Sequence, residues 1–423
     1  MQLALLLFSC SGPDAGGPPV DEASITATVS DAVSTVVTVS WEPADAEGVV
    51  VEHDGVSVVG EGGSAVLYGL PAETDVEFRV LSGDWTSETH TVRTGSVPGE
   101  VPVPVPVTLD APGSNFVLGS NLETPNEGTS VWILDSQGRI VWYHVPDYGT
   151  ATVAHRSADG KSIFYLLTTH DDVPHSRIER VSLDGTLLET IEVPYAHHDA
   201  IEVPDVGYAV ITGDPREVNG ENVVGDRILE IAPDGTQREV WNAFDHLEVV
   251  ENDGWGILAY PEGADWTHAN GINYDARDDS YWLSLYRQEC VYHIARSDGS
   301  VLGTFCGDGS GDWVPDSAFG PQHAPRVTSD GIQFVDNAYD TRESRLVRYT
   351  FGDGTATMNW EFKHPDSRLI LVLGDIDTLP DGRVVSAWGE WRDIMVVDDQ
   401  TVDWRVTMDT VGAVAQVEAF DAF

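Results

Sequence analysis

Several histidines of this chain stand at comparable places in successive repeats of the sequence. By alignment of the repeats, His155, His198, His268 and His323 lie near the start of segments that are typical of β-strands. Imidazole can act as a nucleophile or as a general acid or base near neutral pH, and it also binds metals. A single inward histidine is usually a satisfied core residue, but several at matching positions of a radial fold converge on one axis. We therefore expect a shared site on that axis.

Two chemistries suit such a cluster. Three imidazoles can bind a metal and leave one position open for water. Arg287 follows His268 by about one strand length, and a guanidinium is an unhelpful neighbour for a metal; a surface salt bridge is the alternative for this arginine. In the second chemistry, a neutral imidazole attacks an anionic group, arginine and histidine donors hold its oxygens, and another histidine protonates the leaving oxygen.

The elements that must position these residues are short strands. From residue 109 to 423 a hairpin turn followed by an alternating strand recurs, and the turns are marked by Gly138, Gly185, Gly235, Gly299, Gly354 and Gln400. Six such units predict an all-β fold, a six-bladed β-propeller over 109–423, in which the first strand of each blade lines a central channel. No long stretch has the periodicity of a helix, which disfavours helical and α/β folds.

Three segments precede the propeller. Residues 24–96 alternate as short strands, and "YGLPAETDVEFRV" resembles the corner of a fibronectin type III sandwich. The run "PGEVPVPVPV" predicts a stiff polyproline II linker over 97–108. Residues 1–23 hold an apolar run before Cys10 and resemble a short bacterial lipoprotein signal, which would make Cys10 the lipid-bearing residue and a point of membrane attachment. A frayed N-terminus is the alternative.

The other two cysteines support export independently. Cys290 and Cys306 flank the turn "SDGS" at 297–300, which places them nearly opposite each other on adjacent antiparallel strands. A disulfide between them would indicate a periplasmic or cell-surface location. Two buried free thiols are the alternative.

The charge of the chain excludes one class of partner. There are 70 acidic residues against 22 Lys plus Arg, a formal net charge of −48. Such a surface repels nucleic acid, and it would repel a small anionic substrate unless arginine and histidine reverse the potential within a pocket. The acidic loop "GDGSGDWVPDS" raises the alternative of a calcium site formed by Asp308, Asp312 and Asp316. The loop lacks the ordered spacing of an EF-hand.

An ordered set of motifs resembles the arylsulfate sulfotransferase family. They are "DWTHANGINYD", "YRQECVYHI", "GDGSGDWVPDSAFGPQHAP", "IQFVDNAY" and "SRLVRY", and the resemblance covers residues 109–423. It implies an exported six-bladed propeller with an N-terminal β-sandwich. It also implies ping-pong transfer of a sulfuryl group from a phenolic sulfate ester to a phenolic acceptor, through a sulfohistidine and without a nucleotide donor or other cofactor.

The resemblance implies a role for each motif residue. His323 would be the nucleophile, His268 and Arg287 would bind the sulfuryl oxygens, and His198 would assist; the repeat aligns His198, rather than His197, with His323. Further substrate contacts would come from His197, Trp266, Asn270 and Tyr286. The chain departs from the family at Ala324, where an acidic residue is usual, and at Gly271 and Cys290, where serine is common.

Two other functions stay open at this point. One is a non-catalytic, surface-anchored propeller that binds a polysaccharide or a protein, and the other is a metal-dependent hydrolase or lyase. The joint presence of His268, Arg287 and His323 favours the enzyme, because a degenerated site should have lost at least one of them. His155 matches no catalytic motif, so we expect it to be structural or to line the channel.

Overall fold

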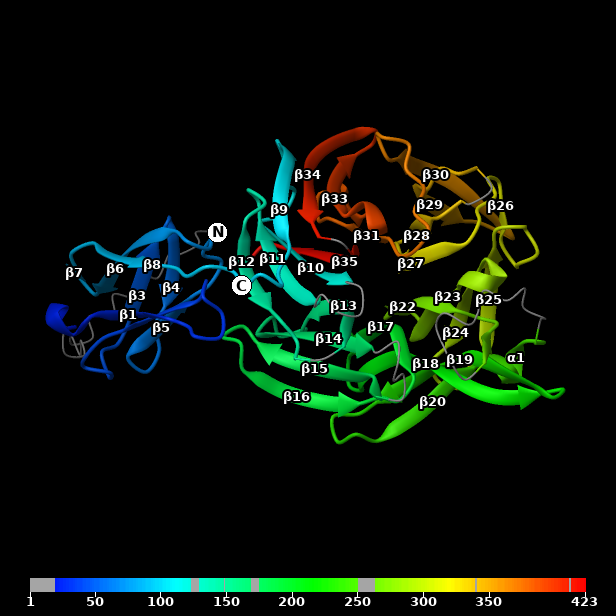
Figure 1. Ribbon diagram of the computed structural model, residues 1–423, viewed down its shortest axis with the longest axis horizontal. Helices are drawn as coiled ribbons and strands as arrows, with labels where there is room; N and C mark the ends of the chain where they lie inside the picture. Colours follow the sequence, from blue (N-terminus) through cyan, green and yellow to red (C-terminus); the bar gives the residue numbers. More distant parts are fainter. Residues whose placement is uncertain are drawn as a thin grey trace, which may run out of the picture. The chain divides into compact units, whose positions relative to one another are not determined.

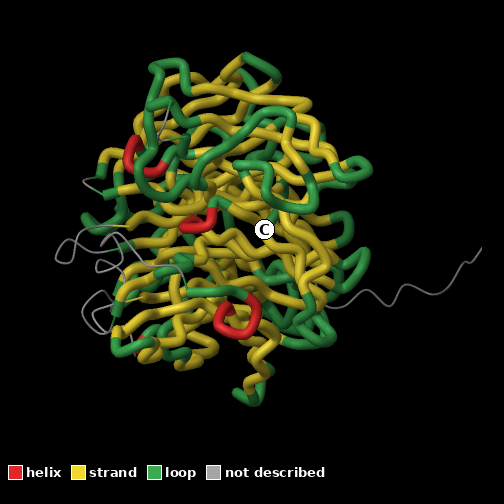
Figure 2. Tube along the Cα trace, turned by 90° about the vertical axis from the view of Figure 1, so that its right-hand side faces the viewer, coloured by secondary structure: helices red, strands yellow, loops and turns green. Residues whose placement is uncertain are grey.

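The computed structural model describes residues 20–122, 129–147, 149–168, 175–249, 263–338, 341–410 and 412–423. Cys10 and most of the expected signal segment lie outside these residues. The chain divides into two compact units, Met1–Ser96 and Val97–Phe423. Strands dominate both (Figure 2), and the helical segments are short: η1 (Glu22–Ser24), α1 (Ala243–His246), η4 (Tyr286–Gln288) and η5 (Gly389–Trp391). The prediction of an all-β chain is confirmed. No helix in the described ranges is long and apolar enough to span a bilayer.

The first unit contains two antiparallel sheets that share one core. One sheet has the order β1-β2-β5, and the other has the order β4-β3-β6-β7 with β8 also paired to β6. In the strand Asp75–Ser82, Val76, Phe78 and Val80 are buried while the residues between them are exposed, which is the alternation that a sheet with one buried face requires. The strands are β1 (Thr26–Val29), β2 (Val37–Ser40), β3 (Val49–His53), β4 (Val56–Val59), β5 (Ser64–Leu67), β6 (Asp75–Ser82), β7 (Trp85–Thr86) and β8 (His90–Arg93).

The second unit contains six sheets of four or five strands in the described residues. The first three comprise β10 (Phe116–Leu122), β11 (Ser130–Asp135), β12 (Ile140–His144) and β35 (Ala413–Phe420); β13 (Thr150–Arg156), β14 (Ser162–Thr168), β15 (Arg177–Ser182) and β16 (Leu187–Glu192); and β17 (Ala196–Val203), β18 (Gly207–Val218), β19 (Glu221–Ile231), β20 (Gln237–Asn242) and the short β21 (Ala264–Asp265).

The next three sheets continue along the chain. They comprise β22 (Ala269–Asp275), β23 (Ser280–Leu285), β24 (Cys290–Ala295) and β25 (Val301–Cys306); β26 (Val314–Pro315), β27 (Gln322–Val327), β28 (Gly331–Asp336), β29 (Arg345–Phe351) and β30 (Thr355–Lys363); and β31 (Asp375–Thr378), β32 (Val384–Ala387), β33 (Asp393–Asp398), β34 (Thr401–Asp409) and β9 (Val103–Leu109).

One edge strand of each sheet faces a common centre. In Figure 1, β13, β17, β22, β27, β31 and β35 surround the middle of this unit, and each of them contacts the next around the circle. The C-terminal β35 joins the sheet formed by β10, β11 and β12, so the two ends of the unit meet within one sheet. The arrangement is propeller-like, and it brings the starts of the inner strands together.

The proline-rich segment is a strand rather than a linker. Residues 103–109 form β9, which pairs antiparallel with β34 so that Leu109 lies opposite Trp404 and Val103 opposite Asp409. The prediction of a polyproline II linker is therefore wrong for 103–108. Pro104 and Pro106 are tolerated because β9 is the edge strand of its sheet, where a missing N–H disturbs no second ladder. Polyproline II and β backbones are both extended, and the partner strand is about 300 residues away in the sequence.

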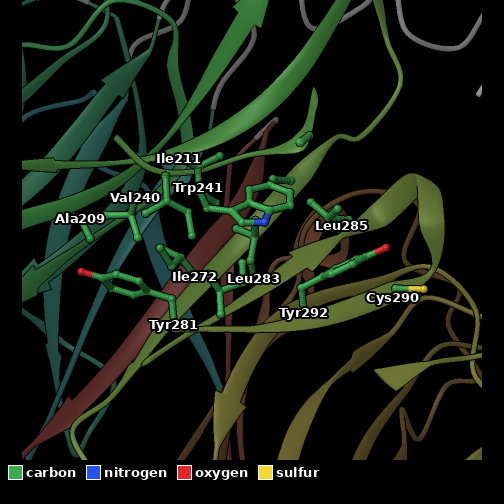
Figure 3. Close-up of a cluster of buried hydrophobic side chains, with 14 of the residues drawn as sticks. Ala209, Ile211, Val240, Trp241, Ile272, Tyr281, Leu283, Leu285, Cys290 and Tyr292 are labelled. Carbon is green, nitrogen blue, oxygen red and sulfur yellow. The ribbon is translucent and has the colours of Figure 1, made fainter. Parts of the chain in front are cut away.

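The third and fourth sheets pack over a continuous apolar cluster. Figure 3 shows Trp241, Tyr281, Leu283 and Tyr292 lying together in it, with Cys290 at its edge. Cys290 lies directly opposite Cys306 on β24 and β25, and the two form a disulfide with a Cα–Cα distance of 4.1 Å. The predicted pairing is confirmed. Next to the turn Ile294 pairs with Val301, and a one-residue register shift between His293 and Ile294 then brings Cys290 opposite Cys306.

Removing this disulfide should destabilise the fold. The bridge closes a loop across a sequence separation of 16 residues, and a loop of that size corresponds to about 3 kcal/mol through the entropy of the unfolded chain. We expect Cys290→Ser/Cys306→Ser to lower the free energy of unfolding in urea by about this amount. A reducing agent should lower wild-type stability to the same extent and leave the double variant unchanged. Equal stability of the two proteins would contradict the prediction.

Candidate active site

Three neighbouring inner strands carry the same local distortion near their first residues. His198, His268 and Ala324 have φ angles of +58°, +51° and +50°, and the register of β17, β22 and β27 shifts next to each of them. Non-glycine residues rarely adopt positive φ, and a bulge of this kind re-aims the side chains around it. The three sheets therefore present polar residues towards the same end of the unit.

The distortion corrects one sequence alignment. By backbone conformation, His198 corresponds to His268 and to Ala324, whereas His323 corresponds to His197. The prediction that aligned His198 with His323 is displaced by one residue. A bulge inserts a residue that alternation along a strand does not reveal.

The structure brings four predicted site residues into one cluster. The ring centroids of His198 and His268 are 4.8 Å apart, and the ring centroid of Tyr286 is 5.4 Å from that of His268 and 5.4 Å from that of His323. Arg287 is the next residue in η4, and its backbone N–H donates to the carbonyl of Thr267 at 3.2 Å. The positive charge of Arg287 acts on His268. The cluster thus combines three imidazoles, a phenol and a nearby guanidinium.

A cavity of about 140 Å³ adjoins this cluster. Asn270 is buried in its wall; its Nδ2 donates to the carbonyl of Gln322 at 2.7 Å, and its Oδ1 has no hydrogen-bond partner among the described residues. That oxygen can therefore accept a hydrogen bond from a bound molecule. The wall is formed by His197, His198, Asp199, Asn270, His323, Ala324, Arg326, Asp375 and Gln416 together with apolar residues of the inner strands.

Trp266, which was predicted as a substrate contact, is not among the residues that line the cavity. Its side chain is 3% exposed and belongs to the apolar cluster between the third and fourth sheets, with its ring centroid 5.5 Å from that of Phe244. Trp266 lies two residues before His268, and its side chain points into the apolar cluster. Closeness to His268 in the sequence therefore does not place Trp266 in the site. Packing of a large apolar ring explains its position.

Asn337 selects the tautomer of His323, and burial keeps its imidazole neutral. The side-chain Nδ2 of Asn337 donates to the carbonyls of Ile370 (3.2 Å) and Leu373 (3.3 Å), which turns its Oδ1 towards His323 Nδ1 at 2.7 Å. His323 therefore carries its proton on Nδ1, and Nε2 bears the lone pair. Burial lowers the pKa of His323 to about 4, and the nearby charge of His268 lowers it as well, against the hydrogen bond to Asn337.

His268 is in the opposite state. Its Nδ1 lies 2.5 Å from Oδ2 of Asp265, and its backbone N–H donates to Oδ1 of the same carboxylate at 2.9 Å. Burial disfavours the charged imidazole, but the carboxylates of Asp265 and Asp226 outweigh burial and raise the pKa of His268 above its usual value. The protonated form of His268 is thus favoured relative to a free imidazole. Tyr286 contacts this ring as well as the neutral ring of His323.

His155 was expected to be structural or to line the channel. His155 lies among acidic side chains, with Nδ1 3.0 Å from Oε2 of Glu418 and Nε2 3.8 Å from Oδ1 of Asp199. It is therefore part of an ion cluster rather than of the cluster around Tyr286.

The acidic loop offers no calcium site. Asp308 accepts the backbone N–H of Ser310, Asp312 accepts two hydrogen bonds from Thr304, and Asp316 accepts the backbone N–H of Met358. The three carboxylates are thus bonded to three different segments of the chain. Within the described ranges, no group of three or more His, Cys, Asp and Glu side chains is placed to hold a metal ion.

Residues 108–310 match the arylsulfotransferase (ASST) family. The match supports arylsulfotransferase activity at the level of the family, and hence small-molecule substrates. It includes His197, His198, His268 and Arg287, while His323 lies beyond it, so the assignment of His323 depends on the geometry above. Among curated proteins, none matches the chain significantly.

Solved structures resemble the chain weakly. TolB from Acinetobacter baumannii has 12% identity and a TM-score of 0.44, with 83% of this chain and 80% of TolB covered. The β-propeller domain of Cps50 (Swd1) from Myceliophteria thermophila has 11% identity and a TM-score of 0.42, with 74% and 92% covered. A protein of unknown function from Bacteroides caccae has 13% identity and a TM-score of 0.43, with 71% and 97% covered. These TM-scores are below 0.5, so the likenesses carry no inference about the site.

Sequence reasoning identified the histidines but missed their partners. Asp265 lies three residues before His268 within the quoted motif "DWTH", and Asn337 lies in "IQFVDNAY", so both were within reach of a search for residues that orient an imidazole. Asp226 lies on β19, outside every motif, and only the fold brings it to His197.

Proposed function

We propose that the protein transfers a sulfuryl group from a phenolic sulfate ester to a phenolic acceptor, through a sulfohistidine at His323 and without a nucleotide donor. The observation that carries the proposal is the fixed tautomer of His323. Its Nε2 lone pair belongs to a neutral imidazole that lines a cavity, and Tyr286 contacts both this ring and His268, whose protonated form is favoured by Asp265. Such a pair combines a nucleophile with a cationic oxygen-binding group. The family match over residues 108–310 supports the same reaction class.

In the first half-reaction, Nε2 of His323 attacks the sulfur of the ester. The N–S bond forms as the S–O bond to the phenol breaks, and the electron pair leaves with the phenolic oxygen. His268 and Arg287 hold the sulfuryl oxygens, since their positive charges oppose the repulsion that a chain with a net charge of −48 exerts on an anion. The leaving phenolate takes a proton from His198. The products are a sulfohistidine and a free phenol.

In the second half-reaction, a new phenol occupies the place of the first. Deprotonated by His198, its oxygen attacks the sulfur, the N–S bond breaks, and His323 returns to its neutral state. The unpartnered Oδ1 of Asn270 is an acceptor for the hydroxyl group of either phenol.

The architecture and the location belong to the same proposal. We infer that the six sheets are the blades of a six-bladed β-propeller, that residues 24–96 form a fibronectin type III-like sandwich, and that the protein is exported to the periplasm or the cell surface with a lipid on Cys10. Support for export comes from the disulfide between Cys290 and Cys306, because disulfides persist in oxidising compartments.

The pKa shifts predict a bell-shaped pH dependence. His323 must be neutral to attack, so kcat/KM should rise as the pH increases through about 4. His268 must be protonated, so kcat/KM should fall as the pH passes its raised pKa, above 6.5. Asp265→Asn removes the carboxylate that holds this proton, so the alkaline limb should move down by about 1–3 pH units. A pH profile of kcat/KM for both proteins checks the prediction; an alkaline limb that stays in place would contradict it.

The proposed reaction is tested on the purified full-length chain in the presence of a chelator. We expect release of the phenol from a chromogenic aryl sulfate to depend on an added phenolic acceptor. Intact mass should reveal one sulfuryl adduct when the donor alone is present, and the adduct should disappear when the acceptor is added. Folded protein that releases no phenol with any acceptor would overturn the proposal and favour a non-catalytic binding propeller.

A further inference from the structure

A buried carboxylate connects two of the catalytic bulges. Asp226 of β19 is 0% exposed. Its Oδ1 lies 2.9 Å from Nε2 of His197, and its Oδ2 accepts hydrogen bonds from the hydroxyl of Thr267 (2.7 Å) and from the backbone N–H of Ala269. His197 belongs to the β17 bulge, and the other two residues flank His268 at the start of β22. Asp226 therefore holds both bulges in position.

The same carboxylate is the end of a hydrogen-bond chain that reaches His198. His197 donates from Nε2 to Asp226, and its Nδ1 faces Nδ1 of His198 at 2.6 Å. Two ring nitrogens at this distance share one proton, because one must donate and the other accept. When His197 is neutral, its Nδ1 is the acceptor, and His198 donates from Nδ1. In that state Nε2 of His198 is the basic nitrogen.

The position of His268 favours movement of a proton along this hydrogen-bond chain, away from His198. The carboxylates of Asp265 and Asp226 favour the protonated form of His268, whose ring centroid is 4.8 Å from that of His198. A second positive charge that stays on His198 is therefore disfavoured by repulsion. A charge on His197 instead lies against the carboxylate of Asp226. The positive charge that His198 gains on taking a proton is therefore more stable on His197.

We propose that Asp226 and His197 form a proton relay behind His198, which stores the proton that the two half-reactions exchange. This inference rests on the proposed sulfuryl transfer and adds Asp226 as a positioning residue. In the acceptor step, the phenol gives its proton to Nε2 of His198, and the proton on Nδ1 of His198 moves to Nδ1 of His197. His197 is then an imidazolium paired with Asp226. In the donor step the transfers run in reverse, and the leaving phenolate receives the proton.

The relay makes a prediction that a structural role does not. Protonation matters most for a poor leaving group, so its loss should depend on the acidity of the departing phenol. For phenyl sulfate, whose phenol has a pKa of ~10, we expect Asp226→Asn to lower kcat/KM by ~10²-fold or more. For 4-nitrophenyl sulfate, whose phenol is far more acidic, we expect the loss to be smaller by about a factor of ten or more. Steady-state kinetics with the two esters, at a fixed saturating acceptor concentration, measure both numbers.

A matched control separates the relay from packing. Asp199 is also buried, and its Oδ2 accepts the backbone N–H of Ile272 of β22 at 3.0 Å, as the Oδ2 of Asp226 accepts the N–H of Ala269. Asp199→Asn should therefore change the rates with the two esters by the same factor. His197→Gln serves as a second relay variant, because a glutamine amide can donate to Asp226 but cannot carry a proton onward. It should reproduce the dependence on leaving group even if Asp226→Asn fails to fold.

The outcomes are distinguishable. Equal losses with both esters in Asp226→Asn and His197→Gln would overturn the relay and leave Asp226 as a structural link only. Absence of turnover by the wild-type protein with either ester would overturn the proposed function itself. A loss concentrated on phenyl sulfate in both variants, against a uniform effect in Asp199→Asn, supports the relay.

Discussion

His323→Ala is expected to lower kcat/KM for an aryl sulfate by ~10⁵-fold, because the attacking atom is removed and no other imidazole occupies its place. His323 is buried, and its side chain contacts Asn337 through a hydrogen bond and Tyr286 through its ring, neither of which belongs to an apolar core cluster. The variant should therefore stay folded. Intact mass after incubation with the donor alone should show no sulfuryl adduct, whereas the wild-type protein should carry one.

His155, a histidine of the inner strand β13, provides the control for this experiment. His155 was grouped with His323 by the sequence repeat, but it lies among Glu418, Asp199 and Gln416 rather than beside Tyr286. We expect His155→Ala to form the sulfuryl adduct and to keep its kcat within about ten-fold of the wild type, because His155 bonds to Glu418 and Gln416, which take no part in the proposed reaction. An adduct in His323→Ala, or its absence in His155→Ala, would show that the nucleophile has been misassigned.

Much of the fold follows from local patterns. Turn glycines such as Gly138 and Gly185 adopt positive φ in the structure, with values of +72° and +91°, and the alternating segments after them are strands. These signals are encoded within a few residues, so a sequence reveals them. The pairing of β9 with β34 is different, because strand partners so distant in sequence are selected by closure of the whole unit, and no local signal distinguishes an edge strand from an extended linker.

The site divides in the same way. Residue types identified His268, Arg287 and His323 as a group, and the structure places them around Tyr286. What the sequence could not supply is protonation. Burial keeps His323 neutral while Asn337 selects its tautomer, and Asp265 favours the protonated form of His268. Burial and hydrogen-bond partners both come from tertiary structure. The bulges had a similar effect, since one inserted residue moved His198 out of alignment with His323.

The dependence of His323 on Asn337 leads to the second large effect. Ala324, which follows His323, has no side-chain oxygen, and Asn337, directly after β28, supplies the orienting oxygen. An asparagine fixes the tautomer without adding the negative charge that would raise the pKa of the imidazole. The site therefore gains a neutral nucleophile whose pKa of about 4 keeps it unprotonated over the working pH range.

Asn337→Leu should consequently lower kcat by ~10²–10⁴-fold, because loss of the group that selects the histidine tautomer costs a serine protease about 10⁴-fold. Asn337→Asp should behave differently, since its carboxylate still accepts the proton of Nδ1 but favours the imidazolium. That variant should retain activity at high pH, and the acid limb of its kcat/KM profile should move upward from about 4. Nitrogen NMR of labelled histidine should report the proton on Nδ1 of His323 in the wild type and a mixture of tautomers in Asn337→Leu. A wild-type rate in Asn337→Leu, or an unmoved acid limb in Asn337→Asp, would mean that the tautomer is set by something other than this amide.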